Sequence, residues 1–292
     1  MQKQVSLVYG EYEKVIIFQN RVKRLIKKIS LLSSIHCEFD SVLVRKKCHV
    51  VNNMSDLLSS LQKQRGRFIY CEIPVSMVRT GHVKGYILGS GKTAGEVYIQ
   101  SKLSRQSLIK YYQERNPKSL EEYLEMILSA DKEVPIYAAP LPWEGFSYSD
   151  LPKKKTSLIN DNINNGVSGK GVTDWAWVGP VSDEKIDSEK RRFDGIYRSV
   201  SQEGFNPRYQ IDGFVEGVFL YERNTLAFHP TRGGHRLQVI ASMGFDRVIV
   251  RVDRKRKHVI TERTVLDNNS INELYTEDEA LSLFKNIVRG VC

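Results

Sequence analysis

The sequence of 292 residues lacks several features that would place it in a familiar class. No apolar run approaches the roughly 20 residues that a helix needs to span a bilayer. The segment MQKQVSLVYGEYEK lacks the basic and then apolar order of a secretory signal. Cysteine is scarce, and no CxxC or metal-type spacing joins Cys37, Cys48, Cys71 and Cys292, which favours free thiols in a reducing compartment. We therefore expect a cytoplasmic protein without a transmembrane segment.

The motifs of several enzyme classes are also missing. No Gly-x-Ser-x-Gly elbow of a serine hydrolase occurs, and His36, His49 and His82 lie in separate segments without the spacing of metal ligands. Trp175 and Trp177 alternate with smaller residues, which is typical of a strand packed on the core. Stacking of a nucleic-acid base on these two indoles is the alternative. These residues alone identify no chemistry.

One glycine-rich segment looks like part of a phosphate-binding P-loop. Residues 89–93 read GSGKT, but the motif requires another glycine three residues earlier, where the sequence has Tyr86. The residues that follow, GEVYIQSKL, have the composition of a strand, whereas a P-loop leads into a helix. We therefore interpret residues 85–95 as a glycine-rich turn, in which Lys92 is placed to contact an anion.

The net charge of +10 is concentrated near the N-terminus. Residues 1–80 hold 14 Lys and Arg against 6 Asp and Glu, whereas the rest of the chain holds 30 against 28. Within this part, residues 14–32 carry apolar residues at helical spacing with lysine and arginine between them. A docked helix with a solvated basic face is the simplest interpretation. Contact of the basic N-terminal half with nucleic acid or with an anionic membrane surface is the alternative.

Alternating strand and helix patterns predict a mixed α/β domain of unknown role over residues 1–150. Its expected elements are strands at 42–51 and 67–75, a helix at 55–64 that Ser55 caps, and a helical region at 104–130 that breaks at Asn116-Pro117 and restarts at the capping residue Ser119. The composition then changes to Asn, Gly, Ser and Lys without an apolar period. We interpret residues 151–172 as a linker or an exposed loop.

The patterns in residues 173–292 predict a second, compact domain. Ser182 begins a helix that ends at Gly204 and whose apolar residues share one face: Phe193, Ile196, Tyr197 and Val200. The expected elements after it are strands at 215–222 and 225–229 joined by a turn at Arg223-Asn224, a helix from Leu237, a strand at 248–252 and a final helix near Thr276. The overall prediction is an α+β fold in which a separate mixed α/β unit precedes this domain.

The segment before the expected helix at Leu237 has the composition of a phosphate-binding loop. Its residues are Arg232, Gly233, Gly234, His235 and Arg236. Glycines let backbone amides approach a ligand, and the first-turn N–H groups and the dipole of a helix favour an anion. Arginines supply forked, charge-assisted hydrogen bonds, and the histidine supplies a donor near physiological pH. A strand-to-helix turn whose arginines pair with acids is the alternative.

The order of segments around this loop resembles the ParB/sulfiredoxin superfamily. A helix end, a hairpin, a glycine loop, a helix and a strand follow one another as in that family: SVSQEGF (199–205), GVFLYERNTLAFH (217–229), GGHR (233–236), LQVIASMGF (237–245) and DRVIVRV (246–252). The resemblance covers about residues 175–255. It implies a ParB/sulfiredoxin-like domain in which Gly233, Gly234 and Arg236 hold the phosphates of ATP or CTP, with Mg²⁺ as a further cofactor.

Departures from the family patterns argue against two of the family's activities. Sulfiredoxins carry a cysteine where this sequence has Gly234, so repair of a sulfinylated cysteine is not expected. Partition-type members read Gly-Glu-Arg-Arg and continue into a helix-turn-helix domain, for which only about forty residues follow the match, so sliding on DNA is not expected. The branch that phosphorylates a small molecule reads His-His-Arg and is closest to this Gly-His-Arg.

Two functions are therefore open. The first is a nucleotide-dependent small-molecule phosphotransferase or nucleotide hydrolase, in which Asp183 and Glu184 are the nearest carboxylates to act on the acceptor and His235 is a further candidate catalytic residue. Negative charge in the first turn of a helix is the alternative role of these two acids. The second is a non-catalytic module that binds a nucleotide or a phosphorylated small molecule, while the basic N-terminal half contacts nucleic acid or a membrane surface. The sequence predicts no oligomeric state.

Overall fold

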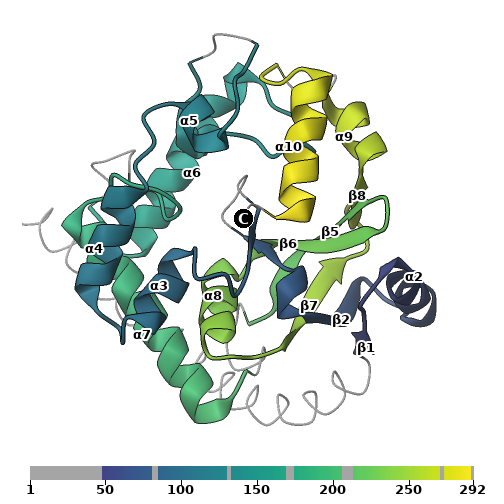
Figure 1. Cartoon of the computed structure of the whole chain (residues 1–292), viewed down its shortest axis with the longest axis horizontal. Coiled ribbons are helices and arrows are strands. Elements are labelled where there is room, and N and C mark those ends of the chain that lie inside the picture. The colour runs from purple at the N-terminus through teal and green to yellow at the C-terminus, as the bar shows by residue number, and fades with distance from the viewer. Residues whose placement is uncertain are drawn as a thin grey trace, which may run out of the picture. The chain divides into compact units, whose positions relative to one another are not determined.

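A mixed β-sheet organises the computed structural model (Figure 1), which describes residues 48–80, 85–129, 133–168, 174–205, 213–269 and 273–290. The strands follow the order β1-β2-β7-β5-β6, and β8 pairs with β5 beside this path. Their bounds are β1 (His49–Val50), β2 (Phe68–Pro74), β5 (Val215–Glu222), β6 (Thr225–Arg232), β7 (Arg247–Asp253) and β8 (Val259–Thr261). A second, two-stranded sheet joins β3 (Arg79–Thr80) to β4 (Tyr86–Ile87).

One pairing in the large sheet joins segments that are far apart in the sequence. β2 runs antiparallel to β7 along its whole length, and both strands alternate between buried and half-buried residues. The expected separation of a domain at 1–150 from one at 173–292 is therefore wrong for the described residues. These all fall within one compact unit, which spans Cys48–Pro207 and Asp212–Cys292. The general prediction of an α+β fold is confirmed.

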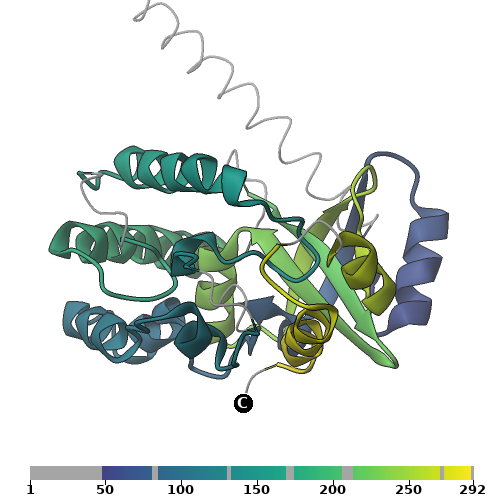
Figure 2. The same ribbon diagram turned by 90° about the horizontal axis from the view of Figure 1, so that it is seen from above.

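The helices of the described residues gather in two places around this sheet. Helices α3, α4, α6 and α7 lie on the same side as α8, whereas α2, α9 and α10 lie around the strands (Figures 1 and 2). The α-helices are α2 (Met54–Lys63), α3 (Ala94–Gln100), α4 (Arg105–Glu114), α5 (Leu120–Leu124), α6 (Leu151–Asn164), α7 (Asp183–Glu203), α8 (Gly234–Ser242), α9 (Glu262–Asn269) and α10 (Glu277–Arg289). Short 3-10 helices occur at Val75–Met77, Ile136–Ala138 and Tyr148–Asp150.

Helix α8 connects the sheet to the layer of helices. Its residues Leu237 and Ile240 pack into a buried cluster with the core-facing residues of β2 and β7. Val239, on the opposite side of the same helix, packs into a second cluster with Tyr98 of α3 and Phe193 of α7. Burial on both sides stabilises this position of the helix. Each Å² of apolar surface removed from water contributes roughly 25 cal/mol to the free energy of folding. The start of α8 is therefore a rigid position.

The main difference from the sequence prediction lies in residues 151–172, which the composition predicts to be a linker or a loop. Most of this segment forms helix α6, with Pro152 in the first turn, where a missing N–H costs no hydrogen bond. The sequence of this helix has little apolar periodicity, since polar contacts and not an apolar face hold the helix against the rest of the protein. Its buried residue Asn162 donates a hydrogen bond from Nδ2 to the carbonyl oxygen of Asp174 at 3.0 Å.

The helix boundaries test the capping predictions. Ser182 caps α7 and Ser119 caps α5, and each accepts a hydrogen bond from the first turn, as expected. The final helix, α10, begins directly after Thr276, near the expected position. The expected break between α4 and α5 is also confirmed, although the helical region ends at Leu124 rather than at residue 130. Helix α2 is capped by Asn53 and not by Ser55, because the Asn53 side chain accepts a hydrogen bond from a first-turn N–H at 3.0 Å.

The segment after GSGKT forms helix α3 and not the expected strand. Thr93 and Glu96 form a capping box at its start, and this local signal outweighs the β-type composition. The hairpin of β5 and β6 and the strand β7 are confirmed. Outside the described residues lie the expected helix at 14–32, most of the expected strand at 42–51, His36 and His82. Within the described ranges, no helix is both long enough and apolar enough to cross a membrane.

Candidate functional site

The two glycines of the RGGHR segment form the junction between β6 and α8. Gly233 has a φ of +84°, in the left-handed region that favours glycine, and α8 begins at Gly234. A Cβ atom on Gly234 would lie 3.3 Å from Cη2 of Trp177, and one on Gly233 would lie 3.1 Å from the Val215 side chain. Glycine at both positions therefore lets the first turn of α8 approach the indole of Trp177.

This junction forms part of a pocket of about 450 Å³, which we call the basic pocket. Five basic side chains from four elements line it: Lys154 of α6, Lys185 and Arg192 of α7, Arg232 of β6 and His235 of α8. The volume falls within the usual range for small-molecule sites. Segments that are far apart in the sequence therefore bring positive charge to one cavity.

Aromatic rings line the same pocket, namely those of Tyr137, Trp175 and Trp177. The prediction of a strand at the two tryptophans is wrong, because this segment pairs with no strand of the described residues. It is held instead by α4, whose residue Tyr112 donates a hydrogen bond from its hydroxyl to the carbonyl oxygen of Ala176 at 3.2 Å. Flat rings beside cations are a suitable environment for a ligand that is aromatic at one end and anionic at the other.

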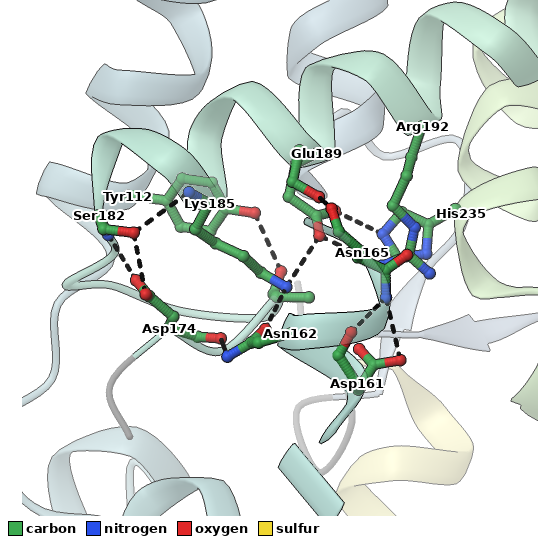
Figure 3. Close-up of polar contacts among 12 residues, drawn as sticks. Tyr112, Asp161, Asn162, Asn165, Asp174, Ser182, Lys185, Glu189, Arg192 and His235 are labelled. Atoms are coloured by element: carbon green, nitrogen blue, oxygen red, sulfur yellow. Dashed lines mark hydrogen bonds and ion pairs between the residues drawn. The ribbon is translucent and has the colours of Figure 1, made fainter. Parts of the chain in front are cut away.

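A buried network of ion pairs holds three of the five basic side chains of the basic pocket (Figure 3). The carboxylate of Glu189, whose side chain is 1% exposed, lies 2.5 Å from Nε2 of His235 and 3.1 Å from Nζ of Lys185. Nη1 of Arg192 lies 3.4 Å from the same carboxylate. The His235 ring also packs on Phe193, with 5.1 Å between the ring centroids. Three charged residues of α7 and the first turn of α8 are thus fixed together.

These surroundings keep Glu189 ionised. Burial alone would raise the pKa of this carboxyl group, but the charge and hydrogen bond of His235 outweigh it, with help from Lys185 and Arg192, and lower its pKa to about 2. The ionised carboxylate engages His235 through Nε2. No hydrogen bond to the other ring nitrogen, Nδ1, is formed among the described residues. Burial also lowers the pKa of the Lys154 ammonium group. The pocket therefore combines one oriented imidazole with several cations.

A chain of hydrogen bonds positions Lys185 within this network (Figure 3). Its ammonium group donates to Oδ1 of Asn162 at 3.0 Å, and Nδ2 of Asn162 donates to the carbonyl oxygen of Asp174 at 3.0 Å. The Asp174 carboxylate accepts hydrogen bonds from the backbone N–H of Ser182 at 2.5 Å and from its hydroxyl at 2.9 Å. Helix α6, the segment before α7 and α7 itself are thereby joined around one buried lysine.

Four of the five residues of the RGGHR segment line the basic pocket: Arg232, Gly233, Gly234 and His235. Arg236 lies in the first turn of α8 and is not among the lining residues. The arginine that the resemblance expects to hold phosphate, Arg236, therefore lies outside the lining, and the arginines of the lining are Arg232 at the end of β6 and Arg192 of α7.

The two acids expected to take part in catalysis lie elsewhere. Asp183, whose side chain is 83% exposed, pairs with Arg105 at 2.7 Å, and Glu184 accepts a hydrogen bond from the backbone N–H of Ser168 at 2.8 Å. Neither of them lines the basic pocket. Both stand in the first turn of α7, where negative charge stabilises a helix. Asp183 and Glu184 thus lie outside the basic pocket, and their catalytic role stays a prediction; the acid that lines this pocket is Asp161, and the acid that engages its cations is Glu189.

The sequence contained a signal for part of what was missed. Lys185 and Glu189 are four residues apart, and Phe193 follows after four more, so all three share one face of α7. A charged pair in line with a core residue indicates a buried ion pair, because charged side chains are almost never fully buried unless paired. The position of Lys154 could not be predicted in this way, because the composition of its segment indicates a loop and not the helix α6 that it forms.

The GSGKT segment is closed by the chain itself. The buried carboxylate of Glu96 accepts hydrogen bonds from the backbone N–H groups of Gly89 at 2.5 Å and Thr93 at 3.1 Å, and from the Thr93 hydroxyl at 2.8 Å. In a P-loop, N–H groups of this kind point at phosphate. An internal carboxylate therefore stands where an anionic ligand would bind, in agreement with the interpretation of this segment as a turn.

The described residues do not supply a metal site. Nowhere in the described ranges do three or more His, Cys, Asp or Glu side chains gather in a way that could hold an ion. In the basic pocket, the Glu189 carboxylate is already engaged by His235, Lys185 and Arg192. A Mg²⁺ ion of the kind that the resemblance implies would therefore have one carboxylate of the pocket lining, Asp161, and would need the phosphates of the ligand for further coordination.

No protein-family model, no curated protein and no solved structure matches this chain. The resemblance to the ParB/sulfiredoxin superfamily thus has no support from these comparisons. The function has to be argued from the geometry of the basic pocket.

Proposed function

We propose that the protein binds a phosphorylated small molecule, and in particular a nucleotide such as ATP or CTP, in the basic pocket. The observation that carries this proposal is the convergence of five basic side chains and the start of α8 on one cavity that two indoles also line. Phosphate oxygens accept hydrogen bonds from such cations and from first-turn N–H groups. A nucleobase suits the rings of Trp175 and Trp177.

The charge balance of the basic pocket supports an anionic ligand. Five basic side chains line the pocket, whereas its acids are Asp161 in the lining and the buried Glu189 that engages three of the basic side chains, so positive charge exceeds negative charge there. Arg232 is exposed at the end of β6 and has no side-chain partner among the described residues. Its guanidinium group is therefore available for a forked interaction with phosphate.

One contact favours catalysis as a second candidate function. The ionised Glu189 orients His235 at 2.5 Å, and a carboxylate that orients a histidine is suited to general acid–base chemistry. In the neutral imidazole, Nε2–H donates to Glu189 and Nδ1 is the atom that would accept the proton of an attacking hydroxyl group or water as a phosphoryl group is transferred; Glu189 then stabilises the imidazolium that forms. The candidate activity is a nucleotide-dependent phosphotransferase or hydrolase. A non-catalytic module that also contacts nucleic acid is the alternative, and its basic residues at 14–28 and 45–47 lie outside the described residues.

Titration with ATP, CTP, GTP and inorganic phosphate, followed by calorimetry and thermal unfolding with and without Mg²⁺, tests the proposal. A ligand at a hundred times its dissociation constant should add about 2.7 kcal/mol to the free energy of unfolding. Arg232→Ala should weaken binding about tenfold, or by about 1.4 kcal/mol. Arg191→Ala is the matched control, because Arg191 is an exposed neighbour of Arg192 that does not line the pocket.

The proposal fails if no nucleotide or phosphate stabilises the wild-type protein, or if the two arginine variants lose affinity equally. Consumption of the bound nucleotide separates the two candidate functions. An enzyme should lose far more turnover than affinity in His235→Asn, because His235 lines the pocket and also acts on the proton, whereas a binding module should not consume the nucleotide at all.

A further inference from the structure

A second pocket, of about 430 Å³, shares Trp177 with the basic pocket. We call it the Arg115 pocket. Its lining includes Tyr86 of β4, Arg115 and Pro117 between α4 and α5, Tyr123 of α5, Trp177 and Val178. Most of these residues lie outside the part of the chain that carries the family resemblance. The Arg115 pocket is therefore a feature of this chain that the resemblance does not explain.

Arg115 is held in place by aromatic rings and not by an acid. Its Cζ atom lies 5.0 Å from the ring centroid of Tyr86 and 4.7 Å from that of Tyr111. Contacts of this kind fix the plane of a guanidinium group without neutralising its charge. Within the described ranges, no ion pair joins Arg115 to a carboxylate. Glutamates line the same cavity, but none of them forms an ion pair with Arg115 among the described residues, so the fork of this oriented cation can still pair with a single carboxylate from solution.

The other charges of the Arg115 pocket limit how much negative charge a ligand can carry. Glu114, Glu122 and Glu125 line the pocket together with Lys118. Three carboxylates repel a nucleotide or a polyphosphate, whereas a single carboxylate can pair with Arg115 at a smaller electrostatic cost. The pocket therefore differs from the basic pocket in the charge of the ligand that it suits.

The remaining walls are apolar. The rings of Tyr123 and Trp177 line the pocket together with Pro117 and Val178, and these side chains offer an apolar surface for a hydrocarbon or aromatic group. Burial raises the pKa of Tyr86, so its hydroxyl group stays protonated at neutral pH and is available as a hydrogen-bond donor. A ligand with one anionic end and one apolar end matches this lining.

We propose that the Arg115 pocket binds a small monocarboxylate with an apolar or aromatic body. The carboxylate pairs with the planar fork of Arg115, and the body packs against Trp177, Tyr123 and Pro117. This inference goes beyond the proposed function, because the site needs no nucleotide. Since Trp177 lines both pockets, the carboxylate and a ligand of the basic pocket would be neighbours.

Calorimetric titration of the full chain with benzoate, hexanoate and benzamide tests the ligand class. Benzamide matches benzoate in size and shape but carries no charge. Both acids should bind about tenfold or more tightly than benzamide, and benzoate should also change the tryptophan fluorescence. Equal binding of benzoate and benzamide, or no binding of either acid, would overturn the proposal.

Substitutions locate the binding site. Arg115→Gln should weaken benzoate binding about tenfold or more, whereas Lys110→Gln, an exposed change on α4 outside the pocket, should leave it unchanged. If Arg115→Gln does not fold, Arg115→Lys replaces it, since lysine keeps the charge but loses the fork and should bind benzoate roughly threefold or more weakly. Unchanged binding in the folded variant would overturn the proposal. Arg232→Ala should keep benzoate binding while it weakens nucleotide binding about tenfold, which separates this inference from the proposed function.

Discussion

Two glycine-rich loops of this protein lead into helices, and in each a buried glutamate organises the loop in a different way. Ahead of α3, the Glu96 carboxylate takes the backbone N–H groups of Gly89 and Thr93. Ahead of α8, the Glu189 carboxylate takes the side chain of His235. The backbone N–H groups of the first loop therefore donate their hydrogen bonds to an acceptor inside the protein. The second leaves the start of its helix facing a cavity.

The difference teaches that the letters of a glycine loop do not decide whether it binds an anion. GSGKT looks more like a known phosphate motif than RGGHR does, yet it is the loop that an internal carboxylate fills. Anion binding depends on where the N–H groups of the loop point and on whether a carboxylate of the protein already accepts their hydrogen bonds. Substitutions in each loop can show whether the two glutamates have these separate roles.

The largest effect should come from Glu189→Ala. The substitution leaves Lys185, Arg192 and His235 without their shared counter-ion in a buried place, so we expect a loss of about 4 kcal/mol in the free energy of unfolding. Urea unfolding curves at neutral pH measure this loss. Glu203→Ala, an exposed change on the same helix, should shift the free energy by less than about 0.5 kcal/mol.

The pH dependence of stability gives an independent check on Glu189. Its pKa is lowered from an ordinary value of 4.5 to about 2 in the folded protein. The stabilisation is therefore complete above pH 4.5 and is lost as the pH falls towards 2, because the unfolded chain takes up the proton first. Glu189→Gln should flatten this part of the curve. A variant curve parallel to that of the wild type would show that Glu189 is not the group that titrates.

The contrast between the two loops also shows which parts of the molecule could be predicted from the sequence. Elements with local signals were predictable: the cap at Ser182, the hairpin turn at Arg223-Asn224 and the strand at 248–252. The pairing of β2 with β7 could not be foreseen, because no local pattern names a partner strand so far along the chain. The division into two domains failed for that reason.

The candidate site was predictable only in its loop. The composition of RGGHR indicated an anion site, and four of its residues line the basic pocket. The cations of α6 and α7 were missed, because their convergence depends on tertiary packing. α6 itself was hidden, since it is held through the polar residue Asn162 and has no clear apolar stripe.

A smaller but still large effect is expected from Glu96→Ala. The change leaves the N–H groups of Gly89 and Thr93 and the Thr93 hydroxyl without their acceptor in a buried turn, so we expect a loss of about 3 kcal/mol in unfolding free energy. Glu122→Ala is the matched control, because Glu122 also accepts a backbone hydrogen bond, from Lys118 at 2.6 Å, but is exposed. It should cost about 1 kcal/mol or less. An equally small loss in Glu96→Ala would mean that water reaches the amides of this loop and that the two loops do not differ.

The smallest effects on stability should come from the glycines themselves, and here ligand binding separates the loops. Gly89 has a φ of +90°, and a Cβ atom added there would meet no atom within 4 Å, so Gly89→Ala should cost about 1 kcal/mol through backbone strain alone and leave nucleotide binding unchanged. Gly234→Ala places its methyl group 3.3 Å from Trp177, so it should displace the indole and weaken nucleotide binding several-fold at a similar or smaller cost in stability. Calorimetric titration of both variants decides the matter. If Gly89→Ala weakened nucleotide binding as much as Gly234→Ala, the anion would be bound by both loops or by neither, and the comparison would not hold.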